Sequence, residues 1–342
     1  MATNNNTMIF PTLGDMLQGV NTPVEKKVVE AVSFATPLVE KMAQKVIQGT
    51  SFFQKVRNSI PMIGAVPYNS GTPVVRGAYE MKKAECFNHS GLVWVDKHLV
   101  EAEPEAYATL MHDEMLGATR GVFANLERSI IYGKAVSPYG MFGLCDLMGD
   151  YLTMSATGDN TKRVHGGASI WVLCTGMEMM RLVWGRGKAL SFGPQKEMLI
   201  PQPTADGGPG MMPVYAKELD FRVGFDMANE NSAVRVVNES KDHGVTDKML
   251  QQMIRELPSG YTPTCVVMGR SSLGRLQDWR GEKLTYTNIM TATHAALPKT
   301  NIDGLPILCT DALLEDETVA NIKELAKVSE LTMKKNMANL KR

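Results

Sequence analysis

The longest regular pattern in the sequence lies between residues 103 and 133, where hydrophobic side chains recur every three or four positions. The residues of this face are Tyr107, Met111, Met115, Ala118, Val122, Leu126 and Ile130. This period predicts a single helix, and Pro104 suits its first position because that position needs no backbone N–H. At about 1.5 Å per residue the helix is about 43 Å long, whereas the usual globular helix has about 11–12 residues.

The segment before this helix is predicted to be extended, because residues 52–98 have no helical period. Strand-like runs such as Phe52–Val56 and Leu92–Val95 alternate with glycine and proline, and Asn69-Ser70-Gly71 favours a turn. Folded back there, two limbs of about 23 residues reach up to about 75 Å. A compact chain of this length has a radius of gyration of about 20 Å. Because an isolated two-stranded hairpin is marginal in water, we expect this one to lie on another molecule.

The remaining chain shows shorter elements of both kinds, so the predicted fold class is α+β. Residues 1–21 form a polar arm, a capping-box pattern at Thr22 begins one helix, and Thr36-Pro37 begins another that continues to Gly49. Five strands are expected, at Ser169–Cys174, Val214–Phe225, Ala233–Val237, Thr264–Met268 and Leu305–Cys309. Helices are expected at residues 247–257, capped by Thr246, and at Ser271–Trp279.

Charge and composition exclude several classes of protein. The 342 residues include 36 basic and 36 acidic ones, a formal charge of zero. A dedicated nucleic-acid binder normally has a basic excess, so the zero charge argues against that class. It does not exclude a protein whose inner surface merely tolerates packed nucleic acid. The sequence shows neither a transmembrane run of about 18 apolar residues nor a secretory signal. Five scattered cysteines without a CxxC pair predict reduced thiols in a cytoplasm.

No specific catalytic, cofactor-binding or metal-binding pattern is present in the sequence. The stretch Gly185–Lys188 is similar to a phosphate loop, but Leu182 and Ala189 stand where glycine and a hydroxyl residue are required. The turn Gly269–Gly274 lacks the GxGxxG spacing and favours an ordinary strand-to-helix turn. The six histidines are dispersed without an HExxH pair. We therefore predict that the chain is not an enzyme and holds no cofactor or metal.

The order of these parts resembles the major capsid proteins of tailed dsDNA bacteriophages. The likeness begins with the polar arm, the extended hairpin and the long helix ending in Ile130-Ile131-Tyr132-Gly133. It continues through Phe142-Gly143-Leu144, Ser169-Ile170-Trp171, the βα unit at 246–280, and Asp303-Gly304-Leu305-Pro306-Ile307 followed by Asp311-Ala312-Leu313-Leu314. The likeness covers residues 8–315 and rests on element order and short patches rather than on an invariant motif.

The resemblance implies an α+β HK97-type capsid fold with five parts and a tail. The implied boundaries are 1–50 for an N-terminal arm with short helices, 51–102 for an extended β-hairpin (E-loop), 103–239 for a peripheral domain with spine helix 103–133, 240–300 for an axial domain, 301–314 for a return strand of the peripheral domain, and 315–342 for a C-terminal tail. Residues 165–238 and 301–314 are expected to complete the peripheral sheet. The tail has no implied role.

The implied function is self-assembly into pentamers and hexamers of an icosahedral shell that encloses double-stranded DNA. The virion would be assembled in the bacterial host cytoplasm. The implied partners are further copies of the chain, a separate scaffolding protein, a portal, DNA held non-specifically on the inner face, and a decoration or cement protein, with no membrane. The expected assembly contacts are Ile9, Phe10, Pro11, Pro67, Tyr68, Asn69, Gly71, Arg76, Tyr79, Lys82 and Lys83.

Two other functions stay open at this stage. An encapsulin-like cellular nanocompartment shell would keep the architecture and enclose an enzyme cargo instead of DNA. A cytoplasmic α/β enzyme would use the βα unit at residues 246–280. The first alternative predicts protein cargo on purification, and the second predicts a small oligomer with a saturable ligand.

Overall fold

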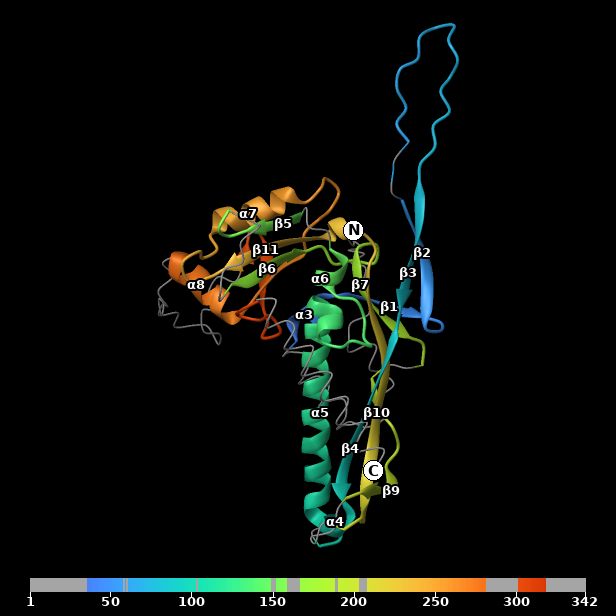
Figure 1. Ribbon diagram of the computed structural model, residues 1–342, viewed down its shortest axis with the longest axis vertical. Coiled ribbons are helices and arrows are strands. Elements are labelled where there is room, and N and C mark those ends of the chain that lie inside the picture. Colours follow the sequence, from blue (N-terminus) through green and yellow to red (C-terminus); the bar gives the residue numbers. More distant parts are fainter. Residues whose placement is uncertain are drawn as a thin grey trace, which may run out of the picture.

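The computed structural model describes residues 36–57, 59, 61–102, 104–148, 152–158, 167–187, 190–202, 208–280 and 301–317. The expected contacts Ile9, Phe10 and Pro11, the expected helix from Thr22 to residue 35, and most of the tail lie outside these residues. Figure 1 shows an elongated molecule with a hairpin that projects beyond its body. None of the described helices is long and apolar enough to cross a membrane.

A six-stranded sheet forms the long axis of the body, with the order β1-β7-β10-β4 and with β8 and β9 also paired to β10. Its strands are β1 (Ala43–Ile47), β4 (Phe87–Asp96), β7 (Met180–Gly185), β8 (Ser191–Phe192), β9 (Lys196–Pro201) and β10 (Met211–Met227). The 17-residue β10 is antiparallel to β4 over ten residue pairs, from Val214–Asp96 to Val223–Phe87. It therefore determines the length of the sheet.

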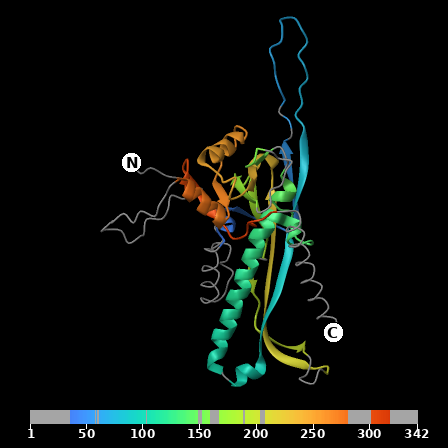
Figure 2. The same cartoon turned by 60° about the vertical axis from the view of Figure 1, so that its left-hand side comes forward.

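The long helix predicted from the hydrophobic period is confirmed as α5 (Pro104–Tyr132), a 29-residue helix. The short helix α4 (Lys97–Ala102) precedes it, and a 3-10 turn (Gly133–Ala135) follows it. Met111 and Met115 pack against Val93 and Val95 of β4. Figure 2 shows α5 running along one face of the sheet, so the helix and the sheet support each other along most of their length.

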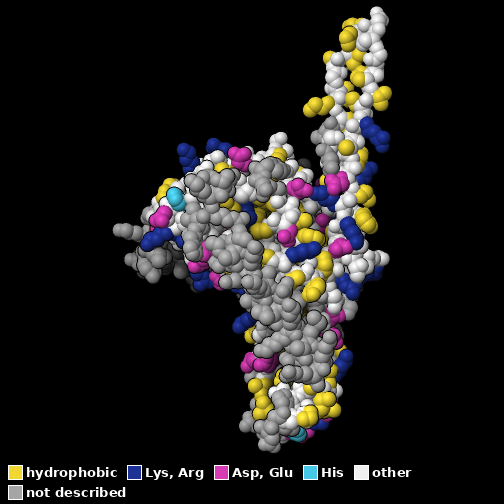
Figure 3. Space-filling model, in the orientation of Figure 1, with side chains coloured by type: hydrophobic (Ala, Val, Ile, Leu, Met, Phe, Trp, Pro, Cys, Tyr) yellow, Lys and Arg dark blue, Asp and Glu magenta, His cyan; other side chains and the backbone are white. Residues whose placement is uncertain are grey.

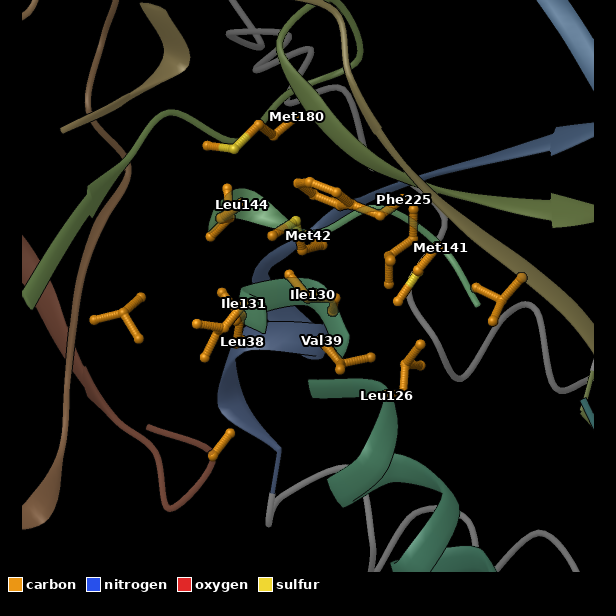
Figure 4. Close-up of a cluster of buried hydrophobic side chains, with 14 of the residues drawn as sticks. Leu38, Val39, Met42, Leu126, Ile130, Ile131, Met141, Leu144, Met180 and Phe225 are labelled. Carbon is orange, nitrogen blue, oxygen red and sulfur yellow. The ribbon is translucent and has the colours of Figure 1, made fainter. Parts of the chain in front are cut away.

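The main hydrophobic core lies where the C-terminal half of α5 meets both sheets (Figure 4). The helices α3 (Pro37–Lys41) and α6 (Leu144–Leu147) pack into the same core. Leu38, Ile130 and Leu144 are fully buried there. Burial of side chains of this size stabilises the fold by about 1.5–3 kcal/mol each, so this junction contributes strongly to the stability of the subunit.

The second sheet has the order β13-β14-β12-β6-β11-β5. Its strands are β5 (Thr153–Ser155), β6 (Ala168–Leu173), β11 (Ala233–Glu239), β12 (Cys265–Met268), β13 (Asn301–Ile302) and β14 (Leu305–Cys309), and the helices α7 (Asp247–Glu256) and α8 (Arg270–Arg280) pack with it. Thr246 caps α7 as predicted, because its hydroxyl oxygen accepts the Met249 N–H. Fully buried Glu239 accepts hydrogen bonds from Ser272 and Arg275, which fixes α8 on β11.

The expected membership of one peripheral sheet is wrong for three strands. β6, β11 and β14 were expected in the sheet that contains β10, yet they pair with one another or with β12 in the second sheet. β6 is buried at every position, and β11 and β14 each contain a short apolar run. Such runs carry no signal for their partners. Their assignment depends on pairing between residues far apart in the sequence.

The expected helix from Thr36 to Gly49 is wrong beyond Lys41. After α3 the chain forms β1, which pairs in parallel with β7 over five residues, from Ala43–Arg181 to Ile47–Gly185. Val46 and Ile47 are β-branched and suit a strand, and this tertiary pairing overrides the weak helical preference of the neighbouring residues. Gly49 still ends the element, with φ of 90°.

Glu317, the last described residue, joins the end of α5 to the second sheet. Its buried carboxylate accepts hydrogen bonds from the Tyr132 hydroxyl at 2.5 Å and from an Arg235 terminal nitrogen at 2.7 Å. The Ser169 hydroxyl also donates to it. The first residues of the predicted tail, Glu315–Glu317, are therefore packed on the body of the molecule.

Candidate assembly surfaces

The projecting hairpin is built from β2 (Ser51–Arg57) and β3 (Tyr79–Glu85), which pair in antiparallel register over seven residues. Beyond these strands the chain runs extended to a turn in which the Ser70 N–H bonds the Pro67 carbonyl. Asn69 adopts a positive φ of 64° in this turn, as the sequence predicted. The hairpin is shorter than the expected 51–102, because β4 leaves it to pair with β10.

The hairpin exposes many large apolar side chains for an element of this size, and Figure 3 shows them along its projecting part. They are Phe53, Met62, Ile63, Val66, Tyr68, Val74, Val75, Tyr79 and Met81. Tyr68 is 100% exposed and Val74 is 99% exposed, so the body of the same chain does not cover the tip. Exposed apolar surface of this kind marks an interaction site.

The predicted contact residues of the hairpin fall into two groups. Those at or near the tip are exposed, namely Pro67, Tyr68, Asn69, Gly71 and Arg76. Nearer the body, the Tyr79 hydroxyl accepts a hydrogen bond from Arg57 at 2.6 Å. Lys82 pairs with Glu230 at 3.1 Å and Lys83 pairs with Glu85. The tip residues are therefore better placed than the root residues to contact another molecule.

A buried polar cluster fixes the root of the hairpin to the sheet. The Arg181 Nε donates to Asp226 at 2.8 Å, and the Gln54 side-chain amide of β2 donates to the other Asp226 oxygen at 2.9 Å. Arg181 also donates to the Gln54 carbonyl oxygen. Burial raises the pKa of Asp226, although Arg181 opposes that shift. Sequence reasoning missed this cluster, since its three members share no motif and lie 45 to 172 positions apart.

Beside this cluster the connection between β3 and β4 crosses β10 at very close range. A Cβ atom on Gly224 would lie 2.0 Å from the Glu85 carbonyl oxygen. The Cys86 thiol donates to the Val183 carbonyl oxygen at 3.2 Å, and the Cys86 N–H donates to Thr50. Only glycine at position 224 permits this approach, so the hairpin leaves the sheet at a sterically defined point.

Replacing Gly224 by alanine is expected to lower the free energy of unfolding by about 1–3 kcal/mol, because either β10 or the Glu85 carbonyl must move. The matched control is Gly91→Ala in β4, where the added Cβ meets nothing within 4 Å. Both variants are compared with the unaltered chain by urea unfolding. Equal stability losses in the two variants would contradict the close-approach argument.

Two cavities flank β3 at the root of the hairpin. One of about 360 Å³ is lined by Met81, Phe142 and Phe225 among other residues. The second, of about 320 Å³, is more polar and includes Arg57 and Asn231. Since Lys82 and Glu230 line both cavities, their ion pair lies between them. This polar pair therefore holds β3 between the two cavities, while Phe52 of β2 packs against Ile47, Cys86 and Val183.

The described residues contain no group of three His, Cys, Asp or Glu side chains arranged to hold a metal ion. The thiols of Cys86, Cys174 and Cys265 are buried, and burial raises their pKa to about 11, about 12 and about 11. Such thiols are poor nucleophiles at neutral pH. The turn Gly269–Gly274, at the start of α8, contains Ser271, whose hydroxyl donates a hydrogen bond to Glu315.

Comparison with known proteins decides the family. The profile of the family described as "Major capsid protein GP7" matches residues 22–321, which is most of the chain. The chain belongs to this major capsid protein family. It is therefore a structural protein of a phage icosahedral shell, located in the virion capsid, and not an enzyme. The predicted family is confirmed.

This major capsid protein is similar in fold to chains of solved structures. A chain from bacteriophage Epsilon15 is 18% identical, with a TM-score of 0.55 over 81% of this chain and 90% of that chain. The bacteriophage JBD30 capsid chain is 11% identical, with a TM-score of 0.45 over 79% and 88%. The SrpI encapsulin of Synechococcus elongatus PCC 7942 is 8% identical, with a TM-score of 0.40 over 60% and 88%. No curated protein matches. The Epsilon15 likeness shows a shared α+β capsid fold.

Proposed function

We propose that the hairpin of each capsid subunit lies on a neighbouring copy and holds the shell together. The observation that carries this proposal is the uncovered apolar tip, where Tyr68 and Val74 are almost completely exposed. Transfer of such side chains out of water favours association by about 1.5–3 kcal/mol each when they become fully buried. The arm residues Ile9, Phe10 and Pro11 are proposed as further contacts. The same hairpin therefore corresponds to the E-loop of the resemblance.

We assign the two sheets to different domains of the capsid subunit. We assign the sheet with β10 and α5 to the peripheral domain. The sheet with β12, α7 and α8 is assigned to the axial domain, which meets its copies around the pentamer and hexamer centres. Contacts repeated around a rotation axis close into rings. Hairpins that engage neighbours at the same time raise the effective concentration of every other contact. Weak pairwise contacts then suffice for a stable lattice.

Four further partners belong to this proposal. A separate scaffolding protein and a portal direct assembly, and packaged double-stranded DNA contacts the inner face without sequence recognition. The formal charge of zero supports weak, non-specific contact with DNA, since tight binders neutralise many phosphates with an excess of Lys and Arg. A decoration or cement protein on the outer face completes the set of proposed partners.

Deleting Asn69–Gly77 is expected to abolish particle formation, because it removes the turn and part of the apolar surface that a neighbour covers. The double variant Tyr68→Ser/Val74→Ser should reduce particle yield strongly without changing the body of the subunit. Thr72→Ser, an exposed tip substitution with little loss of apolar area, is the matched control. Particle yield is measured by negative-stain electron microscopy and size-exclusion chromatography. Wild-type yield from the deletion variant would refute the assigned role.

A further inference from the structure

The solvent-facing side of α5 carries an unusual sequence for an exposed helix surface. Along its outer stripe lie Leu110, Glu114, Gly117, Gly121, Ala124 and Arg128, all exposed. Their spacing of four and three residues places them on one line along the helix. A Cβ atom on Gly117 or Gly121 would meet nothing within 4 Å. Packing within the chain therefore does not require glycine at either position, although glycine weakens a helix relative to alanine.

Charge along this face is divided between the two ends. Asp113 and Glu114 lie on the N-terminal side of the glycines, and Arg120 and Arg128 lie at the glycines and beyond them. None of the four charged side chains forms an ion pair with another residue that the structure describes. In an antiparallel pair of such helices, the acidic end of one faces the basic end of the other. The face is therefore complementary to itself.

A pocket of about 250 Å³ lies beside the basic end and is lined by Arg120, Ala124 and Arg128 of α5. Thr36 also lines it, is only 4% exposed, and has a hydroxyl oxygen without a hydrogen-bond partner in the described structure. The two lining carboxylates have other partners. Glu127 accepts the Leu38 N–H and the Thr310 hydroxyl, and Asp311 pairs with Arg270. Two guanidinium groups and a hydroxyl remain available to an incoming carboxylate.

We propose that two copies of the subunit pack the outer faces of α5 against each other, antiparallel, about a local two-fold axis. In this register Gly117 of each copy meets Gly121 of the other, because a two-fold contact uses the same patch twice. Glu114 of each copy then lies opposite Ala124 of the other copy. The carboxylates of Asp113 and Glu114 enter the other copy's pocket, between Arg120 and Arg128. The glycines permit the close approach of the two helix backbones.

A second copy fits these observations better than nucleic acid does. Asp113 and Glu114 balance Arg120 and Arg128, so the face presents no net positive field to phosphate groups. A phosphate backbone would be repelled by the acidic end along the same stripe, whereas a copy of the helix satisfies both ends at once. This inference rests on the proposed assembly function and names one contact within it.

Charge reversal tests the pairing. The variants Asp113→Arg/Glu114→Arg and Arg120→Glu/Arg128→Glu each place like charges opposite each other in a homotypic pair. Each is expected to lower particle yield by about tenfold or more, because like-charge juxtaposition is costly. A mixture of the two variants restores opposite charges across the contact and should recover particles. Glu178→Arg, an exposed reversal elsewhere, is the control and should assemble normally. Circular dichroism verifies that each variant is folded.

Gly117→Gln/Gly121→Gln provides an independent readout. Glutamine has a higher helix propensity than glycine and has space in the isolated subunit, so the melting temperature should stay equal or rise. Particle yield should nevertheless fall, because the bulkier side chains separate the two helices. A merely structural role for the glycines would predict the reverse.

The outcomes separate this inference from the proposed function. If wild-type protein forms no particles even together with its scaffolding protein, the proposed assembly through the hairpin fails. If wild type assembles and both reversal variants assemble equally well, or if their mixture does not recover particles, the helix pairing is wrong and the assembly function stands. Normal particle yield with selective loss of packaged nucleic acid in Arg120→Glu/Arg128→Glu would assign the arginines to nucleic acid and overturn the pairing.

Discussion

Replacing Asp226 by alanine is expected to lower the free energy of unfolding by about 3–5 kcal/mol, the usual cost of removing one member of a buried ion pair. Asp226 and Arg181 are 6% and 7% exposed at their side chains, and their charged atoms lie 2.7 Å apart. Without the carboxylate, the Arg181 guanidinium stays buried without a counter-charge. The Gln54 amide also loses its acceptor, so the hairpin root should loosen together with the sheet.

The matched control is Asp311→Ala, which breaks the pair between Arg270 and Asp311. Those side chains are 78% and 76% exposed, and such surface pairs contribute at most about 1 kcal/mol. Urea unfolding gives the stabilities, and hydrogen exchange at the amides of β2 and β3 reports the loosening of the hairpin. Losses of similar size in both variants would show that the buried cluster does not hold the root.

Elements with a strong local signal were predictable from the sequence. The three-and-four spacing along α5 and Pro104 at its start gave a helix within one residue of the observed end at Tyr132. The Thr246 cap and the apolar period that follows it, which includes Leu250 and Met253, had the same local character. Each signal arises from neighbouring residues of one element, and no knowledge of a distant partner is required to interpret it.

Elements whose identity depends on distant partners were not predictable. β4 buries Val93 and Val95 toward α5, but Leu92 and Trp94 on the opposite face are also apolar. Because both faces of β4 carry apolar residues, the period of two that marks a half-buried strand is not visible in the sequence. β4 was therefore predicted as part of the hairpin. β7 is buried at every position and carries Arg181 as its second residue, so neither alternation nor uniform hydrophobicity revealed it.

The candidate surfaces divide in the same way. The exposed tip could be predicted from the local sequence. The residues around Asn69-Ser70-Gly71 have no helical period, and no neighbouring segment of the sequence offers a surface that would cover their apolar side chains. The root cluster and the pocket beside α5 could not be predicted, since Thr36, Glu127 and Asp311 come together only after three separate segments have packed. Long-range packing brings these residues together, and none of them is part of a motif that could be recognised in the sequence.

Glu127 is the second position at which a single replacement should have a large effect. Its carboxylate is 3% exposed and accepts the Leu38 N–H of α3 and the Thr310 hydroxyl, both at 2.8 Å. Alanine would leave two buried donors unsatisfied at about 1–3 kcal/mol each. We therefore expect Glu127→Ala to lower the free energy of unfolding by about 3 kcal/mol or more. Glutamine retains an acceptor for Leu38 and should be far better tolerated.

The dependence on pH distinguishes loss of the charge from loss of the hydrogen bonds. Burial, with a smaller contribution from Asp311, raises the pKa of Glu127 above its ordinary value of 4.5. The folded chain thus holds this proton more tightly than the unfolded chain, so wild-type stability falls as pH rises from 4.5 through the raised pKa. Glu127→Gln has no proton to lose, and its stability relative to wild type should improve over that window. Urea unfolding of both proteins between about pH 4 and pH 8 measures the difference. A difference that is constant with pH, or that moves against glutamine as pH rises, would mean that folding does not raise the pKa of Glu127.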